Sequence, residues 1–354
     1  METKNLQSNS KRLKKFYSNL LSIAIFFILH TLFAQNFYAQ KCFTENKPKF
    51  FTTNCQNRTI DWTGSSRNGF ANGSGILKVF ENGKIVYTYT GNILNGQLQG
   101  NGKMKFEYPI EEYIGNFDNG SPNGKGKQIY SDGSVYNGNW LNDMQNGFGK
   151  YTSKNGDFYE GEWENGKTKG KGKLVQKGST YEGDFSENLY DGYGTLTSKD
   201  GFSYVGYWKE GKRNGQGKQT ESDGKIFEGQ WTNDLLSGIG KMVVPQYYTY
   251  EGQLVNNIPN GNGISKFYDG SVYEGQFILG KKNGYGKMIY NDGESYEGQW
   301  LDNTKHGNGL FIWKDGSSYE GIWYHNLRNG RGKYKYSKNS EEVIQNWIND
   351  KLVE

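Results

Sequence analysis

A tandem repeat of about 23 residues governs most of this 354-residue chain. Its copies open on aligned aromatic residues, which are Tyr89, Tyr113, Tyr136, Tyr159, Tyr181, Tyr204, Phe227, Tyr250, Tyr273, Tyr296 and Tyr319. A degenerate copy begins at Trp62, and a half copy from Val343 to Trp347 lies near the C-terminus. A fixed period of this kind indicates a repeat architecture, in which each unit stacks on its neighbours and the end units are atypical.

Each unit opens with the pattern Tyr-x-Gly-x-Trp, for example Tyr159, Gly161 and Trp163. Alternate residues of a strand share one face, so this pattern places rings and glycine on one face and charged residues on the other. The glycine leaves room for rings of neighbouring strands to lie over the backbone. A polar turn and a Gly-x-Gly segment then begin a second strand.

Asp-Gly pairs such as Asp292-Gly293 lead into the next copy, and Asp-Gly between strands is a strong signal for a hairpin with positive φ. We therefore expect an all-β fold, an elongated twisted antiparallel sheet of tandem 23-residue β-hairpins. The tail Ser340–Leu352 could hold a short helix, although its half-repeat pattern favours a strand cap.

The composition of the chain fits this fold. A hydrophobic share of 34% and a mean hydropathy of −0.87 are typical of disorder. An aromatic content of 16% indicates order, because large rings bury much area and favour strands. We expect an ordered β-rich chain with a thin aromatic core.

The N-terminal segment has the pattern of a secretory leader. Lys11, Arg12, Lys14 and Lys15 precede an apolar run from Leu20 to Ala34, which is typical of a signal peptide. The run is short for a membrane span of about 20 residues. We expect cleavage after Ala34, with Ala39 as the second choice; an uncleaved N-terminal anchor is the alternative. We therefore expect the protein in an exported compartment, which is periplasmic, cell-surface or secreted.

The only cysteines, Cys42 and Cys55, follow the leader. An oxidising compartment would permit a disulfide between them, and two free thiols are the alternative. Zinc usually needs four ligands, and the mature chain offers no histidine near these cysteines. The expected organisation is a signal peptide at 1–34, an N-terminal cap at 35–61, the repeat array at 62–340 and a C-terminal cap at 341–354.

The charge of the chain disfavours nucleic acid as a partner. The chain has 42 basic and 37 acidic residues, and residues 1–39 hold five of the basic residues and one acid. The remainder is nearly neutral, with 37 basic and 36 acidic residues that are interleaved. A protein that grips phosphates normally shows a basic excess or stripe.

These repeats resemble the MORN (membrane occupation and recognition nexus) family, whose Tyr-Glu-Gly-x-Trp, Gly-Lys-x-His-Gly-x-Gly and Asp-Gly pattern is nearly intact from Tyr273 to Gly316. The resemblance implies a hairpin sheet with an aromatic groove and a role in scaffolding or assembly; some members dimerise, and some are proposed to touch lipids. The groove would be lined by Tyr159, Trp163, Tyr204, Trp208, Tyr273, Tyr296, Trp300, Tyr319 and Trp323. Val243–Thr249 replaces Asp-Gly with an apolar stretch, which we take as the best candidate for a bulge or a specialised contact.

We find no pattern for catalysis, a cofactor or a metal. His306 occupies the consensus histidine of the repeat, and no residue marks a catalytic triad around it or around His325. The Gly-x-Gly pairs lead into strands, whereas phosphate loops lead into helices. A glutamate recurs at one position of most units, which favours a solvated ladder over an active site; these are Glu160, Glu182, Glu228, Glu251, Glu274, Glu297 and Glu320.

The sequence thus predicts a non-enzymatic exported scaffold that binds a protein partner or its own copy. Two alternatives stay open. Regular Tyr and Trp rows can stack on sugar rings, which would make the chain a cell-surface carbohydrate-binding protein. The second alternative is binding to an anionic lipid surface, although the near-neutral charge and the lack of a Lys/Arg cluster weigh against strong binding.

Overall fold

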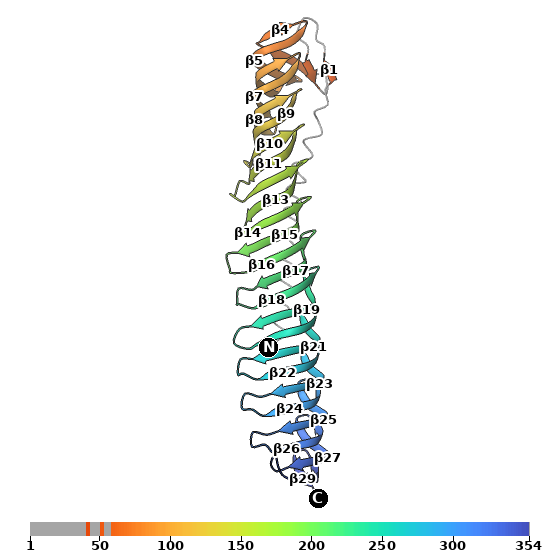
Figure 1. The fold of residues 1–354 in the computed structure, drawn as a ribbon. Helices are drawn as coiled ribbons and strands as arrows, with labels where there is room; N and C mark the ends of the chain where they lie inside the picture. Colours follow the sequence, from red (N-terminus) through yellow and green to blue (C-terminus); the bar gives the residue numbers. More distant parts are fainter. Residues whose placement is uncertain (1–39, 43–49, 53–57, 354) are drawn as a thin grey trace. The chain divides into compact units, whose positions relative to one another are not determined.

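The computed structural model describes residues 40–42, 50–52 and 58–353. The chain divides into two compact units, Met1–Leu196 and Thr197–Glu354, and each is described by itself. All described elements are β-strands, so the predicted all-β class with tandem antiparallel hairpins is confirmed (Figure 1). Within the described part of the chain, no helix has the length and hydrophobicity needed to span a membrane.

The strands of the first unit follow one another in chain order, and from β5 to β14 each pairs antiparallel with the next. Their bounds are β1 Gln40–Cys42, β2 Phe50–Thr52, β3 Arg58–Trp62, β4 Ser65–Arg67, β5 Phe70–Glu81, β6 Lys84–Leu94, β7 Gln97–Glu107, β8 Ile110–Asp118, β9 Ser121–Ile129, β10 Val135–Leu141, β11 Met144–Thr152, β12 Phe158–Glu164, β13 Lys167–Gln176, β14 Ser179–Ser186 and β15 Leu189–Ser198, whose last two residues belong to the second unit.

The second unit repeats this arrangement from β16 to β29. Its strands are β16 Ser203–Lys209, β17 Lys212–Thr220, β18 Ile226–Thr232, β19 Leu235–Val244, β20 Tyr248–Val255, β21 Ile258–Phe267, β22 Val272–Ile278, β23 Lys281–Ile289, β24 Ser295–Leu301, β25 Thr304–Ile312, β26 Ser318–Tyr324, β27 Leu327–Lys335, β28 Val343–Ile348 and β29 Lys351–Val353. The tail therefore forms a strand cap, as its half-repeat pattern favoured.

In the hairpins from β8 onward whose register is described, a β-bulge interrupts the pairing inside the strand that carries the Tyr-x-Gly-x-Trp pattern. In the β24–β25 hairpin, Gly298 pairs with Gly309, but the next pair is Trp300 with Lys305, so Gln299 has no partner on β25. The hydroxyl of Tyr296 donates a hydrogen bond to the Gln299 carbonyl at 2.8 Å. The ring thereby satisfies a backbone acceptor that the bulge sets free.

The two paired glycines make room for this ring. A Cβ added at Gly298 or at Gly309 would lie within 3.0 Å of Tyr296 side-chain atoms. The ring thus lies over a glycine of its own strand as well as one of the neighbouring strand, which extends the prediction from sequence. Ten tyrosines make the same bond to the carbonyl three residues on: Tyr89, Tyr113, Tyr136, Tyr159, Tyr181, Tyr204, Tyr250, Tyr273, Tyr296 and Tyr319.

Phe227 opens the one unit of the eleven that lacks the hydroxyl. Over its glycine pair, Gly229 and Gly240, the nearest side chains are those of Leu236 and Leu254. Phe227 itself is half-buried, whereas Tyr296 is fully buried. The one ring without the hydroxyl is thus not among the nearest groups to its glycine pair.

We expect Tyr296→Phe to lower the free energy of unfolding of the second unit by about 0.5–1.5 kcal/mol, since it removes the hydrogen bond from the buried ring to the Gln299 carbonyl. Urea unfolding monitored by tryptophan fluorescence would measure the change. Tyr285→Phe is the control, because Tyr285 is mostly exposed. Equal stabilities of the wild type and Tyr296→Phe would contradict the assigned role of the hydroxyl.

Consecutive repeats are joined by side chains as well as by strand pairing. The indole nitrogen of Trp323 donates to the carbonyl of Gly309 in the preceding repeat at 3.0 Å, and that of Trp300 donates to Gly286 at 3.0 Å. The tight turns add a reciprocal pair: the amide of Asn326 donates to the Lys305 carbonyl, and the Asn326 side-chain oxygen accepts from the Lys305 amide at 2.7 Å.

Those tight turns are not the Asp-Gly pairs. Asp302 and Asn303 both have positive φ, 48° and 71°, which is the two-residue turn that suits a twisted hairpin. The Asp-Gly pairs lie in longer loops at the other edge, where only the glycine has positive φ, as at Gly316. There the Asp315 carboxylate accepts hydrogen bonds from the amide and hydroxyl of Ser317. The predicted hairpins are confirmed, but the tightest turns lie at the polar segments.

Candidate binding site on the inner face of the second unit

We call the sheet face that carries the Tyr-x-Gly-x-Trp side chains the inner face. All nine aromatic residues proposed for a groove lie on it and are buried, none more than 4% exposed: Tyr159, Trp163, Tyr204, Trp208, Tyr273, Tyr296, Trp300, Tyr319 and Trp323. They form the core that the sequence predicted. As placed, their ring faces are not open to a ligand.

The rings pack edge to face along the sheet. Tyr296 contacts Trp300 of its own strand at 5.0 Å between ring centroids and Trp323 of the next repeat at 5.6 Å. Tyr273 makes the equivalent contacts with Phe277 at 5.1 Å and Trp300 at 5.4 Å. This arrangement brings the positive edge of one ring to the negative face of another. The row is continuous along these repeats.

In the second unit, four cations lie over these rings. The Arg213 guanidinium lies 4.5 Å from the Trp231 ring centroid, and the Arg328 guanidinium lies 3.5 Å from Trp347. The Lys282 ammonium lies 4.4 Å from Trp300, and the Lys305 ammonium lies 4.3 Å from Trp323. Each cation covers the indole of the following repeat, so the inner face presents positive charge above buried rings.

These four residues share one position of the repeat, directly across the hairpin from the aromatic residue that ends the motif. The pairs are Trp208 with Arg213, Phe277 with Lys282, Trp300 with Lys305 and Trp323 with Arg328. In the first unit the same position holds Pro122, Gln145 and Thr168. Among these described repeats, the cation row is therefore a feature of the second unit.

The turn of the following repeat decides whether a cation is neutralised. Arg213 donates to the Asp234 carboxylate at 3.0 Å, and Arg328 donates to the Asp350 carboxylate at 2.8 Å. The equivalent turn residues beside Lys282 and Lys305 are Asn303 and Asn326, whose side-chain oxygens accept only the backbone amides of the lysines. Among the described residues, no carboxylate lies within ion-pair distance of either ammonium.

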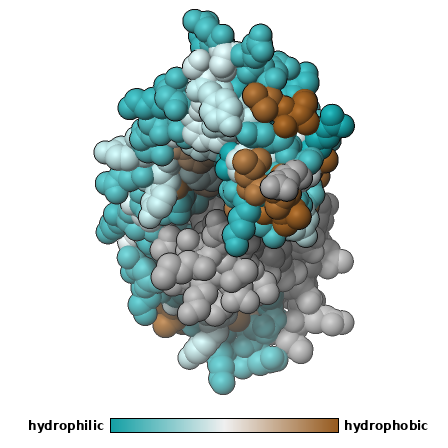
Figure 2. All heavy atoms as spheres, turned by 90° about the horizontal axis from the view of Figure 1, so that it is seen from below, coloured by the Kyte–Doolittle hydropathy of each residue, from teal (hydrophilic) through white to brown (hydrophobic). Residues whose placement is uncertain are grey.

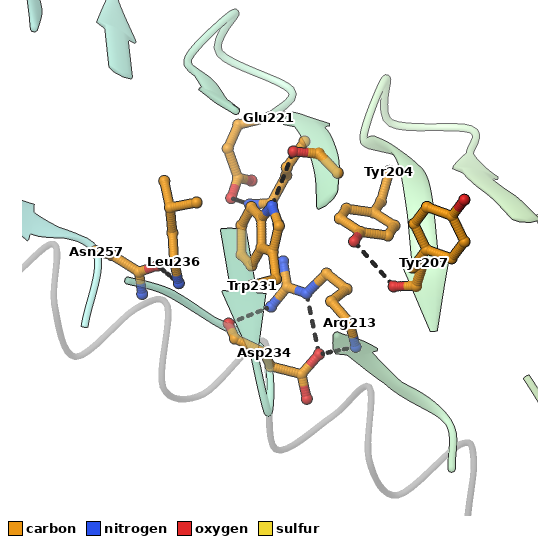
Figure 3. A network of polar contacts seen from close by, with 10 residues as sticks. Tyr204, Tyr207, Arg213, Glu221, Trp231, Asp234, Leu236 and Asn257 are labelled. Atoms are coloured by element: carbon orange, nitrogen blue, oxygen red, sulfur yellow. Dashed lines mark hydrogen bonds and ion pairs between the residues drawn. The ribbon is translucent and has the colours of Figure 1, made fainter. Parts of the chain in front are cut away.

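Figure 3 shows the paired form of this arrangement. The Arg213 side chain extends between Trp231 and the turn that carries Asp234. Its Nε donates to the Asp234 carboxylate, and a terminal nitrogen donates to the Asp234 backbone carbonyl at 3.0 Å. The Arg213 amide donates to the same carboxylate at 2.9 Å. Burial lowers the pKa of Arg213 to about 10 and raises the pKa of Asp234. The hydrogen bond from the Arg213 amide lowers the pKa of Asp234 in part. Charge-assisted hydrogen bonds between the two side chains favour the ionised pair.

The unpaired lysines are half-buried, and burial lowers the pKa of both. For Lys305 the pKa falls to about 8; Asp350 and Glu294 raise it in part, and Arg328 lowers it further. Lys305 lies over Phe311 at 4.2 Å as well as over Trp323. The rings favour the ammonium form, so at neutral pH Lys305 is a desolvated cation held by aromatic faces.

We expect stability to rise with pH because of Lys305. Between its folded pKa of about 8 and its ordinary value of 10.5, the unfolded chain binds more protons than the folded one. The free energy of unfolding therefore rises with pH across this range. Compared with Lys305→Met in urea unfolding, the wild type should gain stability over this window. Parallel pH profiles of the two proteins would refute the lowered pKa.

The outer face carries the predicted charge ladder. Lys150 pairs with Glu160 at 3.0 Å in the first unit, and Lys287 pairs with Glu297 at 3.1 Å in the second. These side chains are about half exposed, and such surface pairs contribute little to stability. The recurring glutamates at this position are therefore solvated pairs with lysine where these contacts form.

Val243–Thr249 forms a hairpin whose register is unbroken, with Val243 opposite Thr249 and Val244 opposite Tyr248. It contains no bulge. Tyr247 at its tip is 71% exposed, and its carbonyl accepts the amide of Tyr268 from the next loop at 2.9 Å. The specialised-contact part of this prediction stays a prediction.

The other predicted features give no chemical site. His306 and His325 lie in consecutive repeats with ring centroids 5.7 Å apart. Among the described residues, no three His, Cys, Asp or Glu side chains gather as metal ligands. Cys55 and the signal peptide at 1–34 lie outside the described residues, so the Cys42–Cys55 disulfide and the leader stay predictions.

Exposed apolar side chains occur on the last hairpin of the second unit. Figure 2, seen from the C-terminal end of Figure 1, shows a mainly hydrophilic surface with a few small hydrophobic areas. The last hairpin carries exposed apolar side chains, among them Val343, Ile344, Ile348 and Leu352.

Comparison with known proteins identifies the repeat. The sequence model described as the MORN repeat matches residues 89–107, 113–135, 136–158, 159–178, 181–202, 204–225, 227–245, 250–272, 273–295, 296–318 and 319–341. A search of curated proteins gives no significant match.

Two similar solved structures are the SAS-4 (dCPAP) TCP domain of Drosophila melanogaster in complex with a proline-rich motif of Ana2 and the wild-type TCP10 domain of Danio rerio CPAP. The first is 13% identical, covers 44% of this chain and 84% of that chain, and has a TM-score of 0.29. The second is 14% identical, covers 63% of this chain and 94% of that chain, and has a TM-score of 0.21. These likenesses are too weak to carry an argument.

Proposed function

The chain belongs to the MORN repeat family, and from this premise we propose that it is a non-enzymatic scaffold whose second unit holds a partner protein on its inner face. MORN repeats typically mediate protein or membrane interactions and are generally non-catalytic. The observation that supports a binding role is the row of cations above the aromatic core. It places charge on a face that a purely structural core would leave apolar.

Two residues of this row, Lys282 and Lys305, support a role in binding a partner more than a role in stabilising the fold. Lys282 and Lys305 are desolvated without a carboxylate, and burial of an unpaired charge is costly. Arg213 and Arg328 occupy the same position with a carboxylate supplied by the turn. A stabilising role alone would favour that paired form at all four positions.

Carbohydrate binding through the Tyr and Trp rows has less support. The nine rings that would stack on sugars are buried under neighbouring rings and cations. Self-association and a separate partner both remain consistent with the scaffold.

The test of the scaffold is its stoichiometry. We expect light scattering on the purified protein, alone and with proteins co-purified from its native compartment, to give a self-associated species or a complex of defined stoichiometry. A monomer at every concentration that forms no stoichiometric complex would contradict the proposal.

We further propose that the scaffold is exported by its leader, with cleavage after Ala34. The support is the basic segment from Lys11 to Lys15 followed by the apolar run from Leu20 to Ala34. N-terminal sequencing of the native protein should begin at Gln35. A native chain that retains Met1 and stays in the cytosol would contradict export, and a retained leader in the membrane fraction would indicate an anchor instead.

A further inference from the structure

The unpaired ammonium groups of Lys282 and Lys305 define a more specific site, and this inference rests on the proposed scaffold function. Both lie on the same face of the second unit, in consecutive repeats, over Trp300 and Trp323. We propose that they bind two carboxylates of an acidic, unstructured segment of a partner protein.

The chemistry of the site selects an anion. Each lysine has lost part of its hydration through burial, and no described carboxylate replaces it. An incoming carboxylate would supply the counter-ion that Asp234 and Asp350 supply to Arg213 and Arg328. Both lysines keep part of their surface exposed, so a partner can reach them from solvent.

The spacing of the site selects the form of the partner. Equivalent residues of consecutive repeats are two strands apart, which is about 10 Å at the usual strand spacing. A polyproline II segment, a common conformer of unstructured chains, rises about 3.1 Å per residue with three residues per turn. Acidic residues at every third position would therefore lie on one side of it, about 9 Å apart, close to the spacing of the lysines.

A narrow chain fits these lysines better than a flat membrane or a duplex. Lys282 and Lys305 are only half-exposed, and they lie within a sheet face and not at an exposed loop tip. Nearly neutral charge outside the leader gives no broad field for a polyanion. Two isolated charges suit a short acidic motif.

The experiment uses a fluorescein-labelled peptide that repeats Glu-Pro-Pro, with full-length mature protein and fluorescence anisotropy as the readout. We expect binding that weakens as salt is added. Lys282→Met and Lys305→Met should each weaken it about tenfold, since each removes one ion pair with a half-buried lysine. A peptide repeating Gln-Pro-Pro should not bind, and one repeating Glu-Pro, which changes the spacing, should bind more weakly.

A matched pair of variants separates loss of the site from loss of the fold. Asn303→Asp and Asn326→Asp retain the lysines but install the carboxylates found at Asp234 and Asp350. Each should weaken peptide binding about as much as loss of the lysine, without lowering stability. Lys281→Met, which removes an exposed lysine that pairs with Asp302, should leave binding unchanged.

Two outcomes would overturn the inference. One is peptide binding unaffected by the Asn→Asp variants or equally affected by Lys281→Met. The other is binding to phosphatidylserine vesicles that is lost in the lysine variants while no peptide binds, which would assign the site to a membrane. If the peptide fails but a stoichiometric protein complex still forms with the Lys282→Met and Lys305→Met variants, the scaffold function stands and only this site falls.

Discussion

Replacing Asp234 by alanine should destabilise the second unit by about 3–5 kcal/mol, because it leaves the buried Arg213 guanidinium without its carboxylate. Both side chains are about one-tenth exposed, so water cannot take the place of the lost partner. The variant also removes the acceptor of the Arg213 amide and weakens the docking of the turn on the preceding repeat.

Two further variants separate these contributions. Asp234→Asn keeps an oxygen for the Arg213 amide and reproduces the neutral turn found at Asn303, so its loss of stability should be smaller than that of Asp234→Ala. Asp302→Ala is the surface control, because its partner Lys281 is about half exposed. Urea unfolding monitored by tryptophan fluorescence provides the measurement. If Asp234→Ala and Asp302→Ala cost the same, the buried pair does not stabilise the unit.

The second large effect is expected for Gly309→Ala, which should cost about 3 kcal/mol. The new Cβ would lie within 3.0 Å of several atoms of the Tyr296 ring, including its hydroxyl oxygen. The ring is fully buried between Trp300 and Trp323 and cannot move aside without displacing them. Overpacking of this kind costs up to about 3 kcal/mol and sometimes more.

The control for this variant is a glycine that serves only a turn. Gly293 has φ of 91°, and a Cβ added to it would meet no atom within 4 Å. Asn tolerates the left-handed region better than most residues, so Gly293→Asn should cost only backbone strain and clearly less than Gly309→Ala. Circular dichroism would show whether Gly309→Ala keeps its strands. A Gly309→Ala protein as stable as Gly293→Asn would show that the ring does not need the glycine.

The sequence predicted the hairpins, the aromatic core and the role of the strand glycines, because these depend on residues that recur in nearly every copy. The period alone places Tyr296, Gly298 and Trp300 on one face. The bulge was not predicted, since it depends on how two strands align across Gly298 and Gly309. The tyrosine in the pattern does not by itself indicate a bulge, because the carbonyl that accepts its hydroxyl is known only from the structure.

The cation row could not be read as a cluster, because its members are separated by a repeat or more along the chain and their position holds leucine or proline in other copies. The available signal was the basic residue five places after the motif's last aromatic residue, as at Lys282, Lys305 and Arg328. The charge state of each then depends on the next turn, where Asn or Asp differ by one functional group. That dependence appears only when the turn is seen to dock on the preceding repeat.

The docking of each turn on the repeat before it gives the array a direction. In the second unit, the amide of Lys305 is satisfied by Asn326, the carbonyl of Gly309 by Trp323, and the charge of Arg328 by Asp350. In these repeats, groups that one copy leaves unsatisfied find their partners in the next copy, and the final half-repeat supplies Trp347 and Asp350 to the last full copy. The two ends of such an array are therefore not interchangeable. A copy inserted in the middle must satisfy groups of the copy before it and must have its own groups satisfied by the copy after it, whereas the C-terminal half-copy only satisfies groups of the copy before it.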